Sequence, residues 1–70
     1  MSFAPGTLLD AAHKAGDHTP ADMARRMGVA YLTAYRWATG RTTPSPRGLA
    51  AIERTYGLTP ADLMRQEATA

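Results

Sequence analysis

Three proline signals divide this chain into segments that suit helices. Thr19-Pro20, Ser45-Pro46 and Thr59-Pro60 each place a hydroxyl side chain directly before a proline. A threonine or serine at the N-cap accepts a hydrogen bond from an unpaired backbone N–H, and proline fits the first helical position because its missing N–H has no partner there. Each pair therefore predicts the start of a helix.

Two of these starts belong to nearly identical pentapeptides, TPADM at 19–23 and TPADL at 59–63. The aspartate three residues after each threonine completes a capping-box-like pair and places negative charge near the positive end of the helix. A duplicated binding motif is one interpretation, and a helix-start signal used twice is the other. The local backbone role of each position favours the helix-start signal.

Glycines supply the matching helix ends. Gly16, Gly28, Gly40 and Gly57 each follow a helix-like stretch, and glycine readily adopts the left-handed conformation that commonly terminates helices. Alternating runs rich in valine, isoleucine and aromatics, which indicate strands, do not occur. The sequence therefore predicts an all-α protein with five helices at about 5–15, 20–27, 30–39, 46–56 and 60–66.

Apolar side chains recur at helical spacing within these segments, which places them on one face of each helix. The predicted core contains Leu8, Leu9, Ala12, Met23, Ala24, Met27, Leu49, Ile52 and Tyr56. Leu58 and Leu63 are expected to cover the end of that core.

A chain of 70 residues predicts one small domain, 1–70, with a core at about 5–66. A domain of this size buries only about 60% of its unfolded surface. Cysteine is absent, which excludes disulfides, and the two histidines, His13 and His18, are too few for a metal site of three or four ligands. Stability must then come from helix packing, dimerisation or both.

Several classes of protein are excluded by what the sequence lacks. No apolar run approaches the ~20 residues that cross a membrane, and MSFAPGTLLDAAHK lacks the regions of a signal peptide, so a cytoplasmic location is expected. Ser2 and Ser45 have no nearby histidine and acid, and no glycine-rich phosphate loop is present. We therefore expect no enzymatic activity and no cofactor.

Positive charge gathers in the middle of the chain. Residues 19–47 hold five arginines against Asp22, a net charge of +4, whereas the remaining residues have a net charge of −2. Seven of the eight basic residues are arginine, whose forked guanidinium suits phosphates and base edges. This distribution favours a nucleic-acid partner, although a solvated basic surface would look the same.

The segment 30–39 does not resemble a plain core helix. At helical spacing, its inner side receives Ala30, Ala34, Trp37 and Ala38. Leu32 and Arg36 then point outward beside Tyr35 and Thr39, with Tyr31 at the edge. Bulky apolar groups beside an arginine make an unusual solvent face, so we interpret it as a contact surface.

The segment before it ends at Met27 and is joined to it by Gly28-Val29. Two short helices connected by a glycine-containing turn form a helix-turn-helix, here at about 19–39. The second helix of such a pair lies in the major groove of DNA.

These residues resemble a known family. TPADMARRMGVAYLTAYRWATGRTTP is similar to the helix-turn-helix of the lambda-repressor/Cro-like (XRE-type) DNA-binding proteins, and the resemblance extends from about Leu8 to Met64. It implies a compact five-helix lambda-repressor-like domain. The fragments that carry it are Met23-Ala24, Gly28-Val29, Arg36-Trp37, Gly40-Arg41 with Pro44, and Leu49…Ile52…Gly57-Leu58…Ala61-Asp62-Leu63.

The resemblance also implies roles for individual residues. Base contacts are expected from Tyr31, Leu32, Thr33 and Arg36. Phosphate contacts are expected from Thr19, Ala21, Arg41, Thr42 and Arg47, so only the first pentapeptide should touch DNA. Leu58, Leu63 and Met64 are the candidate dimer surface, because a small core would gain from burying Leu63 or Met64 against a partner.

The chain departs from the family pattern at several positions. Pro20 stands where a hydrogen-bond donor is common, Ala30 where serine or threonine usually caps the recognition helix, and Ala34 where a larger aliphatic side chain is usual. Tyr31 and Leu32 are less polar than typical base readers, since leucine can touch a thymine methyl but cannot read donors and acceptors. Sequence stringency is the property that these departures affect.

Two functions remain open. The leading hypothesis is a sequence-specific transcriptional regulator, a repressor that inserts the helix Ala30 to Thr39 into the major groove as a homodimer on a palindromic operator. The alternative is a protein-binding adaptor that uses the Tyr31, Leu32 and Tyr35 face. Neither a membrane nor a small-molecule ligand is expected, and the size resembles that of stand-alone phage or prophage regulators.

Overall fold

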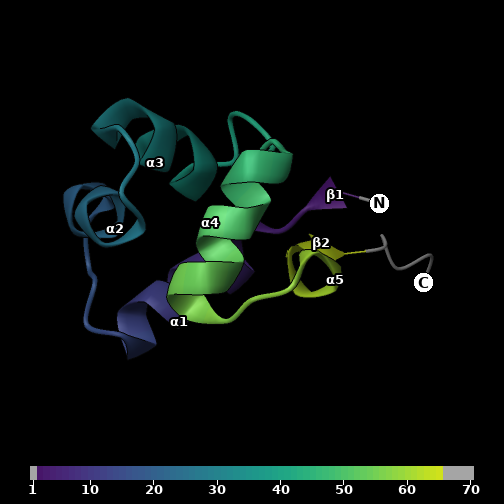
Figure 1. Ribbon diagram of the computed structural model, residues 1–70, viewed down its shortest axis with the longest axis horizontal. Helices are drawn as coiled ribbons and strands as arrows, with labels where there is room; N and C mark the ends of the chain where they lie inside the picture. Colours follow the sequence, from purple (N-terminus) through teal and green to yellow (C-terminus); the bar gives the residue numbers. More distant parts are fainter. Residues whose placement is uncertain (1, 66–70) are drawn as a thin grey trace.

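Five helices and one short strand pair make up residues 2–65, which are the residues that this computed structural model describes (Figure 1). The all-α fold class is confirmed. In chain order the elements are β1 (Ser2–Phe3), α1 (Pro5–Lys14), α2 (Pro20–Met27), α3 (Tyr31–Ala38), α4 (Pro46–Tyr56), α5 (Pro60–Leu63) and β2 (Met64–Arg65).

The helix starts follow the proline signals. The hydroxyl oxygens of Thr19, Ser45 and Thr59 each accept a hydrogen bond from the backbone N–H of the third residue of the helix that follows. Proline occupies the first position of α2, α4 and α5 in each case. The interpretation of the repeated pentapeptide as a helix-start signal is therefore confirmed at both copies.

The two pentapeptides differ in how the aspartate is used. At α5 the carboxylate of Asp62 accepts from the backbone N–H of Thr59 at 2.9 Å, which completes a capping box. At α2 the carboxylate of Asp22 instead accepts from the N–H of His18 at 3.3 Å and pairs with Arg25 at 3.0 Å. Only the second copy is thus a complete capping box.

The turn between α2 and α3 depends on a left-handed glycine. Gly28 has φ 73° and donates its N–H to the carbonyl of Ala24 at 2.9 Å, and Val29 donates to the same carbonyl at 3.1 Å. A residue with a Cβ adopts this conformation only at a cost. The glycine therefore ends α2, and α3 begins three residues later at Tyr31.

Two predicted helix boundaries differ from the structure, and a short strand pair is present that was not predicted. The prediction that the fifth helix reaches residue 66 is wrong, because Met64 leaves the helix and pairs with Phe3 in an antiparallel ladder, with Arg65 opposite Ser2. Next to this ladder, the N–H of Ala4 donates a hydrogen bond to the carbonyl of Leu63 at 2.7 Å. Ala30 was expected on the inner side of the third helix, but it is the exposed N-cap of α3 and supplies no side-chain hydrogen bond.

The core lies where α1, α2, α3, α4 and α5 meet. Its buried members are Leu8, Ala12, Met23, Ala24, Met27, Ala34, Trp37, Ile52 and Leu63, which confirms most of the predicted core. Partly buried side chains pack around them, namely Phe3, Leu9, Val29, Ala38, Leu49, Tyr56 and Leu58.

One predicted dimer residue belongs to this core. Leu63 has no exposed surface, because α5 presses it against the rest of its own chain. The prediction that Leu63 lies on a dimer surface is therefore wrong. Leu58 and Met64 are partly buried, and their role in a dimer stays a prediction.

Candidate nucleic-acid interface

The outward face of α3 carries the two large apolar side chains that are more than half exposed in the described part of the chain. They are Tyr31, 54% exposed, and Leu32, 51% exposed. The ring of Tyr31 stacks on that of Tyr35 one turn later, with centroids 6.2 Å apart and planes inclined by 25°. Arg36 is exposed one turn after Leu32. These four side chains form what we call the α3 face.

Trp37 is the large buried side chain on the opposite side of α3. Its ring is buried against the first turn of α4, where Gly48 leaves the space that it needs. A Cβ at Gly48 would lie 2.6 Å from Cζ2 of Trp37 and 3.1 Å from Cβ of Pro44. Sequence reasoning missed Gly48, although a glycine inside a helix often marks a packing requirement. The close approach fixes how α3 presents its outer face.

Three arginines follow one another from α3 into α4. Arg36 lies on α3, Arg41 in the turn after it and Arg47 in the first turn of α4, and all three are exposed. Within residues 2–65 none of the three forms an ion pair. No aspartate or glutamate occurs from residue 23 to residue 52, so no acidic side chain lies between these arginines in the sequence.

The remaining predicted site residues are divided between two regions. Thr33 is half-buried at the side of α3, and Thr42 is exposed in the turn beside Arg41. Thr19 and Ala21 are exposed at the start of α2, where Thr19 also caps the helix. The roles of all nine predicted base and phosphate contacts stay predictions.

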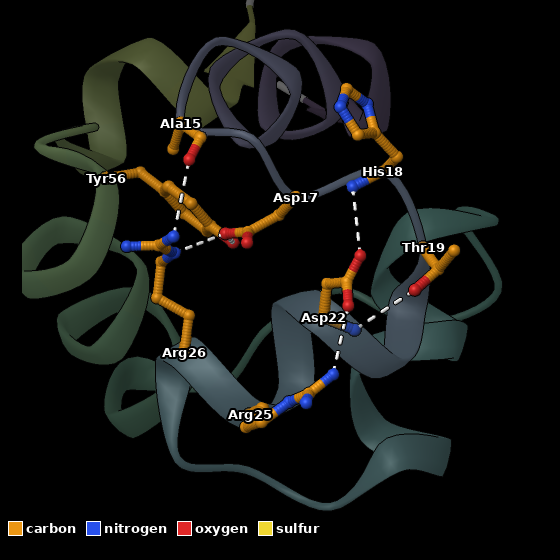
Figure 2. A network of polar contacts seen from close by, with 8 residues as sticks. All are labelled: Ala15, Asp17, His18, Thr19, Asp22, Arg25, Arg26 and Tyr56. Carbon is orange, nitrogen blue, oxygen red and sulfur yellow. Dashed lines mark hydrogen bonds and ion pairs between the residues drawn. The ribbon is translucent and has the colours of Figure 1, made fainter.

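The two arginines of α2 are already engaged with carboxylates (Figure 2). Nε of Arg26 donates to Asp17 at 2.5 Å, and Nη2 donates to the carbonyl of Ala15 at 3.3 Å. Arg25 makes an exposed pair with Asp22 at 3.0 Å. These four charged side chains line a hollow of about 380 Å³, where each positive charge already has a negative partner. The hollow therefore offers no net charge to a ligand.

Asp17 is the buried centre of this network. Its carboxylate accepts from Arg26 and from the hydroxyl of Tyr56 at 2.8 Å, which ties the loop before α2 to the last residue of α4. The hydrogen bond from Arg26 lowers the pKa of Asp17 below 3.8, against the opposing effect of burial. Burial and then the bond to Asp17 raise the pKa of Tyr56 well above 10.0. Sequence reasoning missed this network.

Residues 2–65 contain neither a metal-binding cluster nor a membrane-spanning helix. No group of three or more histidine, cysteine, aspartate or glutamate side chains lies close enough to hold a metal ion. No helix in that part of the chain is long and apolar enough to span a membrane.

Comparison with known proteins finds one family. The family model described as Helix-turn-helix matches residues 11–63, which is well over half of the chain and includes α2, α3, α4 and α5. No curated protein and no solved structure matches the chain.

Proposed function

This chain belongs to the lambda-repressor/Cro-like (XRE-type) helix-turn-helix family of DNA-binding regulators, and we propose that it represses transcription by placing α3 in the DNA major groove. The observation that carries the proposal is the α3 face, which exposes Tyr31, Leu32 and Arg36. Arg36 and the exposed Arg41 and Arg47 that follow it form no ion pair within residues 2–65. A major groove about 12 Å wide accepts an α-helix.

Arg36 is the proposed base reader. It is exposed on α3 and unpaired within residues 2–65, so its guanidinium can reach a base edge without first breaking an ion pair. Arginine contacts O6 and N7 of guanine with two hydrogen bonds, which discriminates against a wrong base by about 1–3 kcal/mol. Tyr31, Leu32 and Thr33 would contact neighbouring base pairs.

Phosphates would be bound on either side of α3. Arg41, Thr42 and Arg47 lie after it, and the start of α2 at Thr19 and Ala21 offers a helix N-terminus. These contacts release counterions and make affinity depend on salt. Arg26 is not proposed as a phosphate contact, because its guanidinium is already paired with Asp17.

We propose a homodimer on a palindromic operator. Two copies of α3 would then enter successive major grooves about 34 Å apart. Leu58 and Met64 stay the candidate contacts between the copies, since both retain exposed surface.

Replacing Arg36 and Arg41 separately tests these roles. We expect Arg36→Ala to lose the preference at one base pair, whereas Arg41→Ala weakens binding to all sequences alike and lowers the salt slope by about one. The measurement is selection of bound duplexes from a randomised DNA pool, followed by salt titrations of the selected duplex. Arg54→Ala is the matched control, because Arg54 is exposed on α4 outside the acid-free stretch and should change neither property.

Two outcomes would contradict the proposal. Equal weakening on all sequences by both variants would remove the base-reading role of Arg36. Enrichment of no sequence, together with weak binding that disappears at moderate salt, would leave only nonspecific attraction to phosphates. The surface of exposed Tyr31 and Leu32 and half-buried Tyr35 would then favour the adaptor function, with a protein in place of DNA.

A further inference from the structure

We propose that Leu32 makes the protein sensitive to the C5-methyl group of one pyrimidine in each operator half-site. The group is the methyl of thymine or of 5-methylcytosine, which is the same chemistry at the same position of the major groove. The inference rests on the proposed insertion of α3 and adds a methyl requirement to it.

The position of Leu32 on α3 is the first step. Ala34 and Trp37 are buried on the inner side, and at 100° per residue Leu32 lies about 170° from the midpoint between them. Its side chain is 51% exposed and belongs to no part of the core. Leu32 therefore occupies the centre of the α3 face and would point deepest into a groove.

The side chains on either side of Leu32 make it the apolar centre of the α3 face. On one side lie the stacked rings of Tyr31 and Tyr35, with centroids 6.2 Å apart. On the other side Arg36 supplies the charged group. Leu32 has neither a donor nor an acceptor, so it cannot satisfy a polar base edge, and burying such an edge against it costs free energy.

The chemistry of the groove then selects the partner of this side chain. Base pairs present donors, acceptors and one kind of apolar group in the major groove, and that apolar group is the pyrimidine methyl. A methyl placed against Leu32 gains hydrophobic contact, whereas the C5 hydrogen of cytosine or uracil leaves a gap. The base pair that faces Leu32 is thus expected to carry a methyl.

Charge distinguishes DNA from a protein as the occupant of this face. No carboxylate occurs from residue 23 to residue 52, and Arg36, Arg41 and Arg47 are exposed around it without an ion pair within residues 2–65. Such a surface complements the phosphates that border the major groove. The apolar centre and its basic surroundings together match a methyl set between two phosphate backbones.

The test uses the full chain and the operator selected from the randomised pool. Each thymine of the half-site is replaced in turn by deoxyuridine, which removes only the methyl, and each cytosine by 5-methylcytosine, which adds it. We expect one position per half-site at which the methyl tightens binding about fourfold, and about fifteenfold when both half-sites change together. A loss with deoxyuridine identifies thymine as the source, and a gain with 5-methylcytosine identifies a methylated cytosine.

Variants assign the effect to Leu32. Leu32→Ala should remove the methyl dependence while keeping the guanine preference of Arg36, and the fold should persist because the side chain is exposed. Arg36→Ala is the matched control and should keep the methyl dependence. Specific operator binding with no methyl effect at any position, or an effect that survives in Leu32→Ala, would overturn this inference alone. Failure to select any operator would remove the proposed function and this inference with it.

Discussion

Replacing Gly48 by alanine will lower the free energy of unfolding by about 1–3 kcal/mol, although alanine is the better helix former. The new Cβ would lie 2.6 Å from Cζ2 and 2.9 Å from Cη2 of Trp37, which is closer than carbon atoms can approach. The ring cannot turn aside easily, because it is buried between α3 and α4, and Pro44 bounds the same space at 3.1 Å. Relief requires a shift of α3 or α4.

Urea unfolding measures this effect, and the chain supplies a matched control. Gly6 is also a helical glycine near a helix start, but a Cβ there would meet no atom within 4 Å. We expect Gly6→Ala to be neutral or to stabilise the protein by less than about 1 kcal/mol. Equal midpoints for Gly48→Ala and Gly6→Ala would show that the contact with Trp37 does not limit the packing.

A double variant separates this clash from a general loss of stability. Trp37→Phe removes the outer ring atoms that the new Cβ would meet, at the cost of a cavity. We therefore expect the loss for Gly48→Ala with Trp37→Phe to be smaller than the sum of the two single losses. Affinity for the proposed operator should follow the same pattern, because Trp37 is next to Arg36 and the packing of the Trp37 ring against α4 sets the direction of the α3 face. Additive losses would contradict the contact.

Replacing Asp17 by asparagine will destabilise the fold by about 1–3 kcal/mol. The buried carboxylate accepts from both Arg26 and Tyr56, and the amide that replaces it carries no charge for the guanidinium. Asp22→Asn is the instructive comparison, since its pair with Arg25 is exposed and should contribute less than about 1 kcal/mol. Equal losses for the two variants would show that burial does not strengthen the Asp17 network.

The same network predicts a pH dependence with a definite sign. Arg26 lowers the pKa of folded Asp17 below its ordinary 3.8, so the unfolded chain takes up this proton first as the pH falls. The contribution of Asp17 to stability is complete above that value and is lost below it. Tyr56 behaves in the opposite sense, because its raised pKa makes its contribution complete below pH 10.0 and lost above. The measurement is the urea midpoint of unfolding as a function of pH. As the pH falls toward and below 3.8, the midpoint should fall less steeply for Asp17→Asn than for the unchanged protein. Parallel curves for the two proteins would show that Asp17 does not cause the loss of stability in acid.

The sequence predicted those features that depend on neighbouring residues. Thr19 and Thr59 start helices because a hydroxyl and a proline act within one turn, and Gly28 ends α2 through its own backbone angle. The outward position of Leu32 followed from helical spacing alone and is confirmed by its exposure. Each of these arguments needed only a few consecutive residues.

Features that join distant residues were not predicted. Asp17 and Tyr56 are 39 positions apart, and no local pattern indicates that a carboxylate in a loop will meet a tyrosine at the end of α4. The pairing of Phe3 with Met64 shortens α5 for the same kind of reason. Leu63 was expected both to cover the end of the core and to lie on a dimer surface; its burial confirms the first prediction and contradicts the second, because spacing along the sequence could not say which apolar side chain of α5 the core would take. Gly48 was missed because its importance depends on a ring from another helix.

The ladder of β1 and β2 has a mechanical consequence. Ser2 faces Arg65 and Phe3 faces Met64, so a force that pulls residues 2 and 65 apart acts on one end of the ladder and opens its pairs in succession. Such peeling meets the resistance of one pair at a time, whereas shearing would load both together. Figure 1 places this ladder on the opposite side of the molecule from α2. Tension applied at residues 2 and 65 would therefore open β1 and β2 before it is transmitted to α2 and α3.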